Sequence, residues 1–381
     1  MGPRPRILHL LESGGMYGAE RVVLNLAEAQ KAQGEYEPIV GCIVGMFGEP
    51  CALLDAAGAA GIETMEVRLR NGALMMDVPR AARLLRAGRV ALVHSHGYKA
   101  TVYGSLVKLL RPLPFTATCH LWFMRPGSPL RMRVMVALEL RLYRRFRTVA
   151  AVSGDIARVL ALNGVDERRI AVVPNGIPLA VAPPDADRRR RLRQALGVPQ
   201  DAFLVLNGGR LTEQKDQASL IRAIGCMVDG TRPVHGLIAG EGRLRAELQR
   251  LIDEGRRGAP VRLLGFREDM SELLGAADVL ALPSLDEGMP MILLEAAALG
   301  LAIVATAVGD IPTLIRDGET GLIVPRGEPD ALAAALNRLR DEVGLAERLG
   351  AAARERVRDN HSHEAMAASY SRIYREHLNG S

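Results

Sequence analysis

The chain has 381 residues, a length that suits two α/β domains better than a single core. Hydrophobic residues make up 48% and aromatic residues only 4%, so the apolar content is mainly aliphatic, as in helices packed on parallel sheets. The formal net charge of +6 is uneven, because residues 1–175 carry +9 and the remainder carries −3. A basic first half indicates an anionic acceptor or membrane surface, or else an ordinary solvated surface.

Cysteine usage and hydropathy exclude several classes of protein. The four cysteines form no Cys-x-x-Cys pair and no zinc pattern with the eight histidines, which argues for a reducing compartment and against a structural metal. No signal-peptide pattern opens the chain, and no apolar run reaches the roughly 18 residues that a membrane span needs. We therefore expect a cytoplasmic protein that is not integral to a membrane.

Short apolar runs alternate with helical patterns along the whole chain, as in βαβ units. In the first half we predict helices over 19–33 and 99–110, and strands over Ile7–Leu11, Pro38–Ile43, Ala91–His94, Phe115–Thr118 and Val149–Val152. In the second half we predict strands over Phe203–Asn207, His235–Ala239, Val261–Leu264, Val279–Ala281 and Ala302–Ala305. The expected fold class is therefore α/β, with a Rossmann-like parallel sheet in each half.

A domain boundary is predicted near residue 176. The segment Val173–Pro178 has two prolines around a glycine, and a polar stretch rich in proline and arginine continues to Pro199. Prolines fix φ and end the element before them. We predict an N-terminal domain over 1–175, a C-terminal domain over 176–361 and a final helix over 362–381.

Each half opens with a strand that runs into a glycine turn. The first turn contains Gly14, Gly15 and Gly18, and the second contains Gly208 and Gly209. In open α/β sheets, ligands bind outside the carboxyl ends of the strands, where helix N-termini attract anions. Each turn is either part of such a site or simply a tight link between strand and helix.

Two cations follow the second glycine turn. Arg210 and Lys215 are five residues apart at the expected mouth of the sheet, where both can face one pyrophosphate. They would stabilise the negative charge that grows when a nucleoside diphosphate leaves. The alternative is a solvated helix start in which Glu213 is the local partner.

Two glutamates flank a predicted helix start in the second half. Pro290 suits the first turn of a helix, which places Glu287 in the loop before it and Glu295 inside it. Glu295 has leucines and alanines on both sides in the sequence, a costly environment for a carboxylate that lacks a partner. The hydroxyls of a sugar or ribose can donate to both of its oxygens.

Together these residues resemble glycosyltransferase family 4, whose members are retaining enzymes with the GT-B fold. The resemblance rests on Glu287 and Glu295, separated by seven residues, and on Arg210 and Lys215 upstream. Similar segments follow in order along nearly the whole chain: Gly14–Glu20, Thr118–His120, Ala151–Ser153, Val173–Gly176, Ala239–Gly242, Leu264–Phe266 and Gly318–Pro325. Pro290 stands where many relatives have glycine, which leaves the donor sugar open.

The resemblance implies two Rossmann-like domains with a cleft between them, a C-terminal helix that crosses back to the first domain, and a set of site residues. Glu295 would bind the donor ribose, Glu287 the transferred sugar, and Arg210 and Lys215 the pyrophosphate. His120 would contact the sugar near the anomeric carbon, and a core histidine is the alternative interpretation. The remaining implied residues are Gly15, Gly288, Met289, Pro290 and Met291 at the phosphates, Arg262 and Gly265 at the base, and Tyr17, His120 and Arg125 at the acceptor.

The resemblance further implies retaining, metal-independent transfer of a hexose or N-acetylhexosamine from a nucleotide sugar, with UDP as the first choice. The expected acceptor is a saccharide or lipid-linked saccharide of cell-surface polysaccharide or glycolipid synthesis, with no resident cofactor and no nucleic-acid partner. The alternatives are an inactive scaffold that binds nucleotide sugar, or a transferase with a small-molecule acceptor. A glycosidase would have no need of Arg210 and Lys215. A pyridoxal-dependent phosphorylase would need a further lysine in the C-terminal half, which has Lys215 alone. A dinucleotide oxidoreductase would need a glycine fingerprint that neither turn has.

A basic, apolar helix pattern spans Arg125–Arg147, which holds seven arginines and the single acid Glu139. Such a helix can lie on an anionic membrane and meet a lipid-linked acceptor. It can equally be a buried helix with an arginine-rich end.

Overall fold

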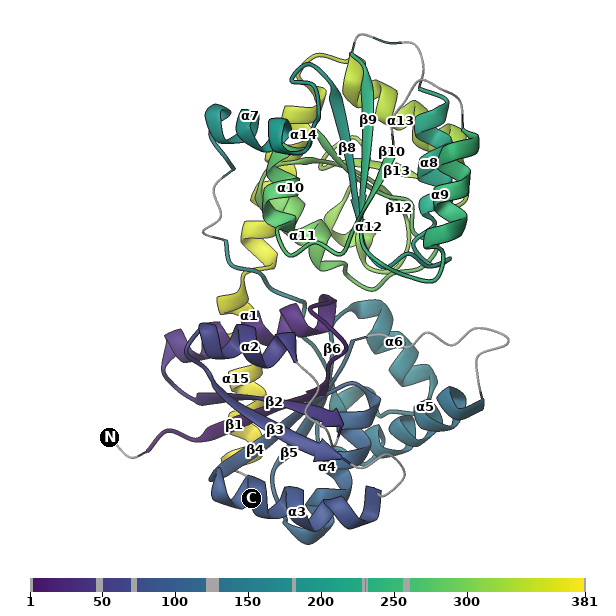
Figure 1. The fold of residues 1–381 in the computed structure, drawn as a ribbon. Coiled ribbons are helices and arrows are strands. Elements are labelled where there is room, and N and C mark those ends of the chain that lie inside the picture. Colours follow the sequence, from purple (N-terminus) through teal and green to yellow (C-terminus); the bar gives the residue numbers. More distant parts are fainter. Residues whose placement is uncertain are drawn as a thin grey trace. The chain divides into compact units, whose positions relative to one another are not determined.

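The computed structural model describes residues 3–45, 51–69, 74–120, 130–179, 183–227, 230, 232–255 and 261–379. The chain forms two compact units, one made of residues 1–178 with 361–381 and the other of residues 179–360 (Figure 1). The first unit thus ends at Pro178 and resumes at His361, where the sequence predicted changes after residues 175 and 361. Among the described residues, no helix is both long and apolar enough to cross a membrane.

The first unit is built on a parallel sheet with strand order β3-β2-β1-β4-β5-β6-β7. Because parallel sheets are covered on both faces, their strands are apolar runs, and β1, β2 and β5 are almost fully buried. The strands are β1 (Arg6–Glu12), β2 (Glu37–Gly45), β3 (Glu63–Leu69), β4 (Val90–His96), β5 (Phe115–Cys119), β6 (Val149–Ala151) and β7 (Ile170–Val172). The helices are α1 (Gly18–Gln33), α2 (Ala52–Ala59), α3 (Leu74–Ala87), α4 (Tyr98–Leu110), α5 (Leu130–Tyr143), α6 (Gly154–Leu162) and α15 (His363–Asn379), with a 3-10 turn at Glu167–Arg169.

The two faces of this sheet have separate cores. Leu8 and Leu10 of β1 belong to a large cluster with Val78 and Tyr103, from α3 and α4. Leu11 belongs to a smaller cluster with residues of α1 and α2. Alternation along β1 therefore turns His9 toward the α1 face, since successive strand residues point to opposite sides.

The last helix, α15, belongs to the first unit although it ends the chain (Figure 1). Tyr370 and Tyr374 are almost completely buried, and Tyr36 donates from its hydroxyl to the carbonyl of Ser371 at 3.3 Å. The Tyr36 and Tyr374 rings meet edge to face at a centroid distance of 5.5 Å. Aromatic packing thus fixes α15 on α1 and the sheet.

The second unit repeats the plan with strand order β10-β9-β8-β11-β12-β13, all pairs parallel. Its strands are β8 (Phe203–Gly208), β9 (Val234–Ala239), β10 (Val261–Gly265), β11 (Val279–Leu282), β12 (Ala302–Thr306) and β13 (Leu322–Val324). Its helices are α7 (Ala186–Ala195), α8 (Gln217–Gly225), α9 (Arg245–Glu254), α10 (Met270–Ala276), α11 (Met291–Ala298), α12 (Ile311–Leu314), α13 (Pro329–Asp341) and α14 (Leu345–Asn360).

All ten strands predicted from the sequence are confirmed, each within three residues of its predicted ends. The strands Glu63–Leu69, Ile170–Val172 and Leu322–Val324 were missed. The first alternates apolar and charged residues in a way that resembles a solvated segment, and the other two have only three residues each. The fold class predicted from the sequence is correct.

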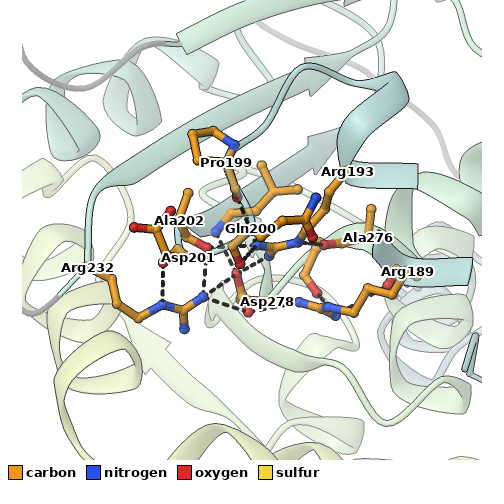
Figure 2. A network of polar contacts seen from close by, with 12 residues as sticks. Arg189, Arg193, Pro199, Gln200, Asp201, Ala202, Arg232, Ala276 and Asp278 are labelled. Carbon is orange, nitrogen blue, oxygen red and sulfur yellow. Dashed lines mark hydrogen bonds and ion pairs between the residues drawn. The ribbon is translucent and has the colours of Figure 1, made fainter. Parts of the chain in front are cut away.

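An arginine cluster holds the amino-terminal edge of the second sheet together. Figure 2 shows Arg189, Arg193 and Arg232 converging on Asp278, which directly precedes β11. Arg193 contacts the Asp278 carboxylate at 2.5 Å, Arg189 at 2.9 Å and Arg232 at 3.3 Å. The same carboxylate accepts the backbone N–H of Leu204 at 2.7 Å. Asp278 therefore joins α7, β8 and β11, and nothing in the sequence pattern had singled it out.

Substitution of Asp278 by asparagine should destabilise this unit strongly, because Arg193 is buried and would lose its counter-charge. We expect a loss of about 3–5 kcal/mol in the free energy of unfolding, measured by chemical denaturation. Asp187→Asn is the matched control, because Asp187 pairs with Arg190 on an exposed surface and should change stability by less than about 1 kcal/mol. Equal losses in the two variants would contradict a structural role for the cluster.

Candidate functional site

The motifs of the second half gather at one point of the second sheet. Between β8 and β11 the strand order reverses direction along the chain, and such switch points open a crevice at the carboxyl ends of the strands. The loop after β8 carries Arg210 and Lys215, and the loop after β11 carries Glu287. Asn207 ties the two strands by donating from its side-chain amide to the carbonyl of Ala281 at 2.8 Å.

Lys215 and Glu287 form a largely buried ion pair at this point. The Lys215 ammonium lies 2.5 Å from Oε1 of Glu287, whose side chain is only 6% exposed. The Ser284 hydroxyl donates to the same oxygen at 2.7 Å. Burial of either charge alone would be costly, so the pair positions both groups. Glu287 still has further lone pairs that can accept hydroxyl protons.

Side chains from the first loop brace the second. The side-chain amide of Gln214 donates to the carbonyl of Asp286 at 2.8 Å, and the backbone carbonyl of Gln214 accepts the N–H of Leu285 at 2.8 Å. Gln217, at the start of α8, donates to the carbonyl of Arg210 at 3.0 Å, while the Arg210 side chain is exposed. The two loops therefore act as one rigid frame, with one cation paired inside it and one at its surface.

Close backbone approaches leave no room for larger residues around this frame. A Cβ atom on Gly240, with φ of +146°, would lie 1.9 Å from the carbonyl oxygen of Gly209. A Cβ on Gly309, with φ of +53°, would lie 1.9 Å from the carbonyl oxygen of Glu287. Glycine is required at both positions, because any Cβ atom would clash with these backbone carbonyl oxygens, and a positive φ also favours glycine. Gly309 thus allows its backbone to pack directly against the Glu287 loop.

Helix α11 begins directly behind the ion pair. Pro290 is its N-cap, with φ of −66° and ψ of 130°, so the helix starts one residue later than the sequence suggested. Met291 is buried at the first helical position, and Glu295 lies one turn further along, partly buried. The free N–H groups at a helix N-terminus attract an anion. Gly288, Met289 and Met291 have N–H groups there, whereas Pro290 supplies none.

The two residues predicted for a base pocket are not brought together. Gly265 ends β10 beside the glycine loop after β9, and its carbonyl accepts the N–H of Gly240 at 2.7 Å. Arg262 lies near the other end of β10, and its guanidinium donates to the carbonyl of Leu196, ahead of β8. Gly265 is therefore at the site edge of the sheet, while Arg262 is at the opposite edge.

The first unit has its own switch point between β1 and β4. Gly15 lies in the loop after β1 with φ of +149°, and Ser13 donates from its hydroxyl to the Gly15 carbonyl at 3.1 Å. Tyr17 is the N-cap of α1, with 43% of its surface exposed and its N–H bonded to Glu20 at 3.2 Å. The glycine turn and Tyr17 thus share one edge of this sheet.

His120 directly follows β5 on the same edge and is partly buried. Its Nε2 lies 3.0 Å from Nδ1 of His96, and burial lowers the pKa of His120 to about 4, so the ring is neutral at physiological pH. A neutral ring can accept or donate one hydrogen bond to a sugar hydroxyl. Arg125, the remaining residue predicted to face the acceptor, lies outside the described residues.

The polar residues that support these groups were not predicted from the sequence. Ser284 contacts Glu287, and His9, His94 and His96 line up behind His120. The spacing of His94 and His96, two residues apart in a predicted strand, was a usable signal, because it puts both rings on one face. Nothing in the sequence places His9 beside them, since it lies 85 residues earlier.

Comparison with known proteins agrees with this architecture. The profile described as "Glycosyltransferase Family 4" matches residues 16–181, and the profile described as "Glycosyl transferases group 1" matches residues 202–342. The chain is 36% identical to a D-inositol 3-phosphate glycosyltransferase of Thermomonospora curvata, over 54% of this chain and about half (52%) of that protein. It is 28% identical to the protein of the same name from Streptomyces scabiei, over 96% of this chain and 88% of that one.

Solved structures share the fold over almost the whole chain. Anabaena HepE, crystallised with UDP-glucose, superposes with a TM-score of 0.85 at 22% identity, covering 97% of this chain and 99% of that one. The sucrose-phosphate synthase of Thermosynechococcus elongatus gives a TM-score of 0.80 at 21% identity, covering 99% and 100%. The chain belongs to the glycosyltransferases of family 4 and has the GT-B architecture of two Rossmann-like parallel-sheet domains.

Proposed function

We propose that this chain transfers a hexose or N-acetylhexosamine from a UDP-linked sugar to an acceptor hydroxyl. The observation that carries this proposal is the Lys215–Glu287 pair at the switch point of the second sheet, directly ahead of α11. Lys215 would donate its remaining N–H groups to the donor diphosphate, and the sugar hydroxyls would take up the remaining lone pairs of Glu287. HepE was crystallised with UDP-glucose, which favours UDP as the nucleotide here.

We propose that the diphosphate is held without a metal ion. Arg210 supplies an exposed planar guanidinium, Lys215 a compact charge, and α11 the positive end of a helix dipole. These groups would stabilise the leaving diphosphate as negative charge develops on it. Glu295, one turn into α11, would accept the ribose hydroxyls.

We further propose that the reaction retains anomeric configuration by front-face transfer. In that mechanism the leaving diphosphate accepts the proton of the incoming hydroxyl, so no side chain has to attack the sugar. The state of Glu287 supports this, because a carboxylate that already binds an ammonium and a hydroxyl is a weak nucleophile. His120 would contact the transferred sugar near the anomeric carbon.

For the acceptor, the first candidate is a saccharide or lipid-linked saccharide at an anionic membrane surface. On α5, Val136 and Tyr143 are buried, which makes one face of this helix an ordinary core face. Leu130, Val134 and Leu138 form a second, exposed stripe at a spacing of four residues, and the exposed Arg133 and Arg141 lie on the same helix. An exposed apolar stripe with arginines suits a surface of anionic lipid.

The second candidate is a small polar acceptor. The curated relatives described above are D-inositol 3-phosphate glycosyltransferases, so they act on a small anionic polyol. The basic first half of this chain, at +9 over residues 1–175, is compatible with such an anion. With this acceptor, the α5 stripe would have no part in the reaction.

Thermal unfolding with UDP, GDP and ADP tests the donor site. At about 100 times its dissociation constant, the correct nucleotide should stabilise the protein by about 2.7 kcal/mol and raise the melting temperature by several degrees. Glu295→Ala should abolish this shift, whereas Glu247→Ala, an exposed glutamate on α9, should keep it. If no nucleotide shifts the wild type, the proposed donor site is wrong; a shift without any sugar transfer favours a nucleotide-sugar-binding scaffold.

Flotation with anionic vesicles at low salt separates the acceptor candidates. We expect the wild type to float with the vesicles and the double variant Val134→Ser, Leu138→Ser to stay in solution, because the exposed stripe is then polar. Val343→Ser, at a fully exposed apolar residue of the second unit, should float like the wild type. A wild type that ignores the vesicles would exclude the membrane surface and leave the small acceptor as the better candidate.

A further inference from the structure

A file of buried histidines runs through the first unit toward His120. His9 on β1 and His94 on β4 are paired across the parallel strands, and His96 follows two residues later on the same face. His9 and His94 are 0% exposed and His96 is 4% exposed. All three rings lie on the face that α1 and α15 cover, and none had a role in the proposed reaction.

Three of the four rings, those of His9, His96 and His120, are linked in series. Nδ1 of His9 lies 3.3 Å from Nε2 of His96, and Nδ1 of His96 lies 3.0 Å from Nε2 of His120. At the far end, Nε2 of His9 lies 2.8 Å from the side-chain oxygen of Gln30 on α1. The file thus runs from Gln30 through His9 and His96 to His120, whose Nδ1 is the ring nitrogen that the file does not use.

Burial keeps the rings of this file neutral. It lowers the pKa of His9 to about 4, against a smaller opposing effect of the Gln30 hydrogen bond, and lowers the pKa of His120 to about 4. It lowers the pKa of His96 well below its usual value, and the neighbouring rings of His94, His120 and His9 add to this. A neutral imidazole has one N–H and one lone pair, so hydrogen bonds in series must all run in the same direction. The group at one end therefore decides the tautomer at the other.

The orientation of the Gln30 side-chain amide sets that direction. Its side-chain N–H donates to the hydroxyl of Tyr374 on α15 at 3.3 Å, which leaves the amide oxygen facing His9. His9 must then carry its proton on Nε2 and accept with Nδ1. It follows that His96 donates from Nε2 to His9, and that His120 donates from Nε2 to His96.

The neighbouring ring, His94, holds the file in place. Its Nδ1 lies 2.7 Å from the Tyr374 hydroxyl and its Nε2 lies 2.7 Å from the hydroxyl of Thr118 on β5. The Thr118 hydroxyl is in turn 2.8 Å from that of Tyr370. The His94 ring also lies against that of His96, tilted by 38° at a centroid distance of 4.1 Å. Helix α15 thereby supports the strands that carry the file.

We propose that Gln30, His9 and His96 are positioning residues that fix His120 as the Nε2–H tautomer, with the lone pair of Nδ1 presented to a hydroxyl of the transferred sugar. This proposal rests on the proposed function, in which His120 contacts that sugar. It specifies the chemistry of the contact: His120 accepts a hydrogen bond from the sugar hydroxyl and does not donate one. The other tautomer would present an N–H at Nδ1, which would donate to the oxygen of the hydroxyl instead of accepting a hydrogen bond from it.

A metal site is the other arrangement that these rings could form, since ligand atoms of His9, His94 and His96 lie within 4.8 Å of one another. Each of their six ring nitrogens, however, already has a hydrogen-bond partner among the described residues. An ion would have to break these bonds inside an almost solvent-free layer. The hydrogen-bonded file explains the same geometry without that cost.

The test combines tautomer measurement with kinetics on the full-length protein. With histidine labelled by nitrogen-15, long-range proton–nitrogen correlations should show His120 protonated on Nε2 in the wild type at neutral pH. Gln30→Leu should produce a mixture of His120 tautomers and lower kcat for sugar transfer on the order of 10-fold, with the donor KM almost unchanged. Gln30→Glu keeps the acceptor oxygen and should retain the tautomer. Gln33→Leu, on the same helix and bonded to the Glu364 carbonyl of α15, should behave like the wild type.

Three outcomes would overturn the proposal: wild-type His120 protonated on Nδ1, an unchanged His120 tautomer in Gln30→Leu, or zinc that shifts the three buried rings at one equivalent. The tautomer measurement needs no substrate, so it decides the file even if the wild type transfers no sugar. Absence of transfer would instead count against the proposed function. A Gln30→Leu variant that fails to fold leaves the wild-type tautomer and the Gln30→Glu variant to decide.

Discussion

The ion pair between Lys215 and Glu287 is the interaction on which the candidate site of the second unit depends. Neither charge could be buried alone at this depth, so each holds the other at the switch point, where the strand order reverses. The loops that carry them are locked by Gln214 and by the close approach of Gly309 to the Glu287 carbonyl. A rigid frame of this kind has its hydrogen-bonding groups in place before the donor arrives, which lowers the entropy that binding would otherwise cost.

The two units share a topology but differ in the charge of the groups at their switch points. In the second unit, the switch point collects cations and a helix N-terminus, which suit a diphosphate. In the first unit, the corresponding edge holds a glycine turn and a neutral histidine that is linked to a buried file of uncharged rings. Uncharged groups suit sugar hydroxyls, because they can direct hydrogen bonds without the desolvation cost of a full charge. The arginine cluster around Asp278 lies at the other edge of its sheet and serves stability (Figure 2).

Sequence patterns located the strands and the charged motifs because both are local signals. A buried parallel strand is a continuous apolar run, and Glu287, Pro290 and Glu295 lie within one loop and one helix. The histidine file could not be found in this way, since His9, Gln30, His96 and His120 come together only through strand pairing and helix packing. Asp278 was missed for the same reason, as its three arginines come from α7 and from a distant loop. Arg262 shows that residues close in the sequence can also lie apart in the site. It is near Gly265 on the same strand but contacts the opposite edge of the sheet.

The most direct test of the central claim is calorimetric titration of UDP into the wild type and into the double variant Lys215→Met, Glu287→Gln. This variant removes both charges together and keeps similar side-chain volumes, so no unpaired charge is left buried. If Lys215 binds the diphosphate, the variant should lose about 1.5–3 kcal/mol of binding free energy, roughly a 10-fold to 150-fold weaker affinity. Its affinity should also depend less on salt concentration. A double variant that binds UDP as tightly as the wild type, with the same salt dependence, would contradict the account.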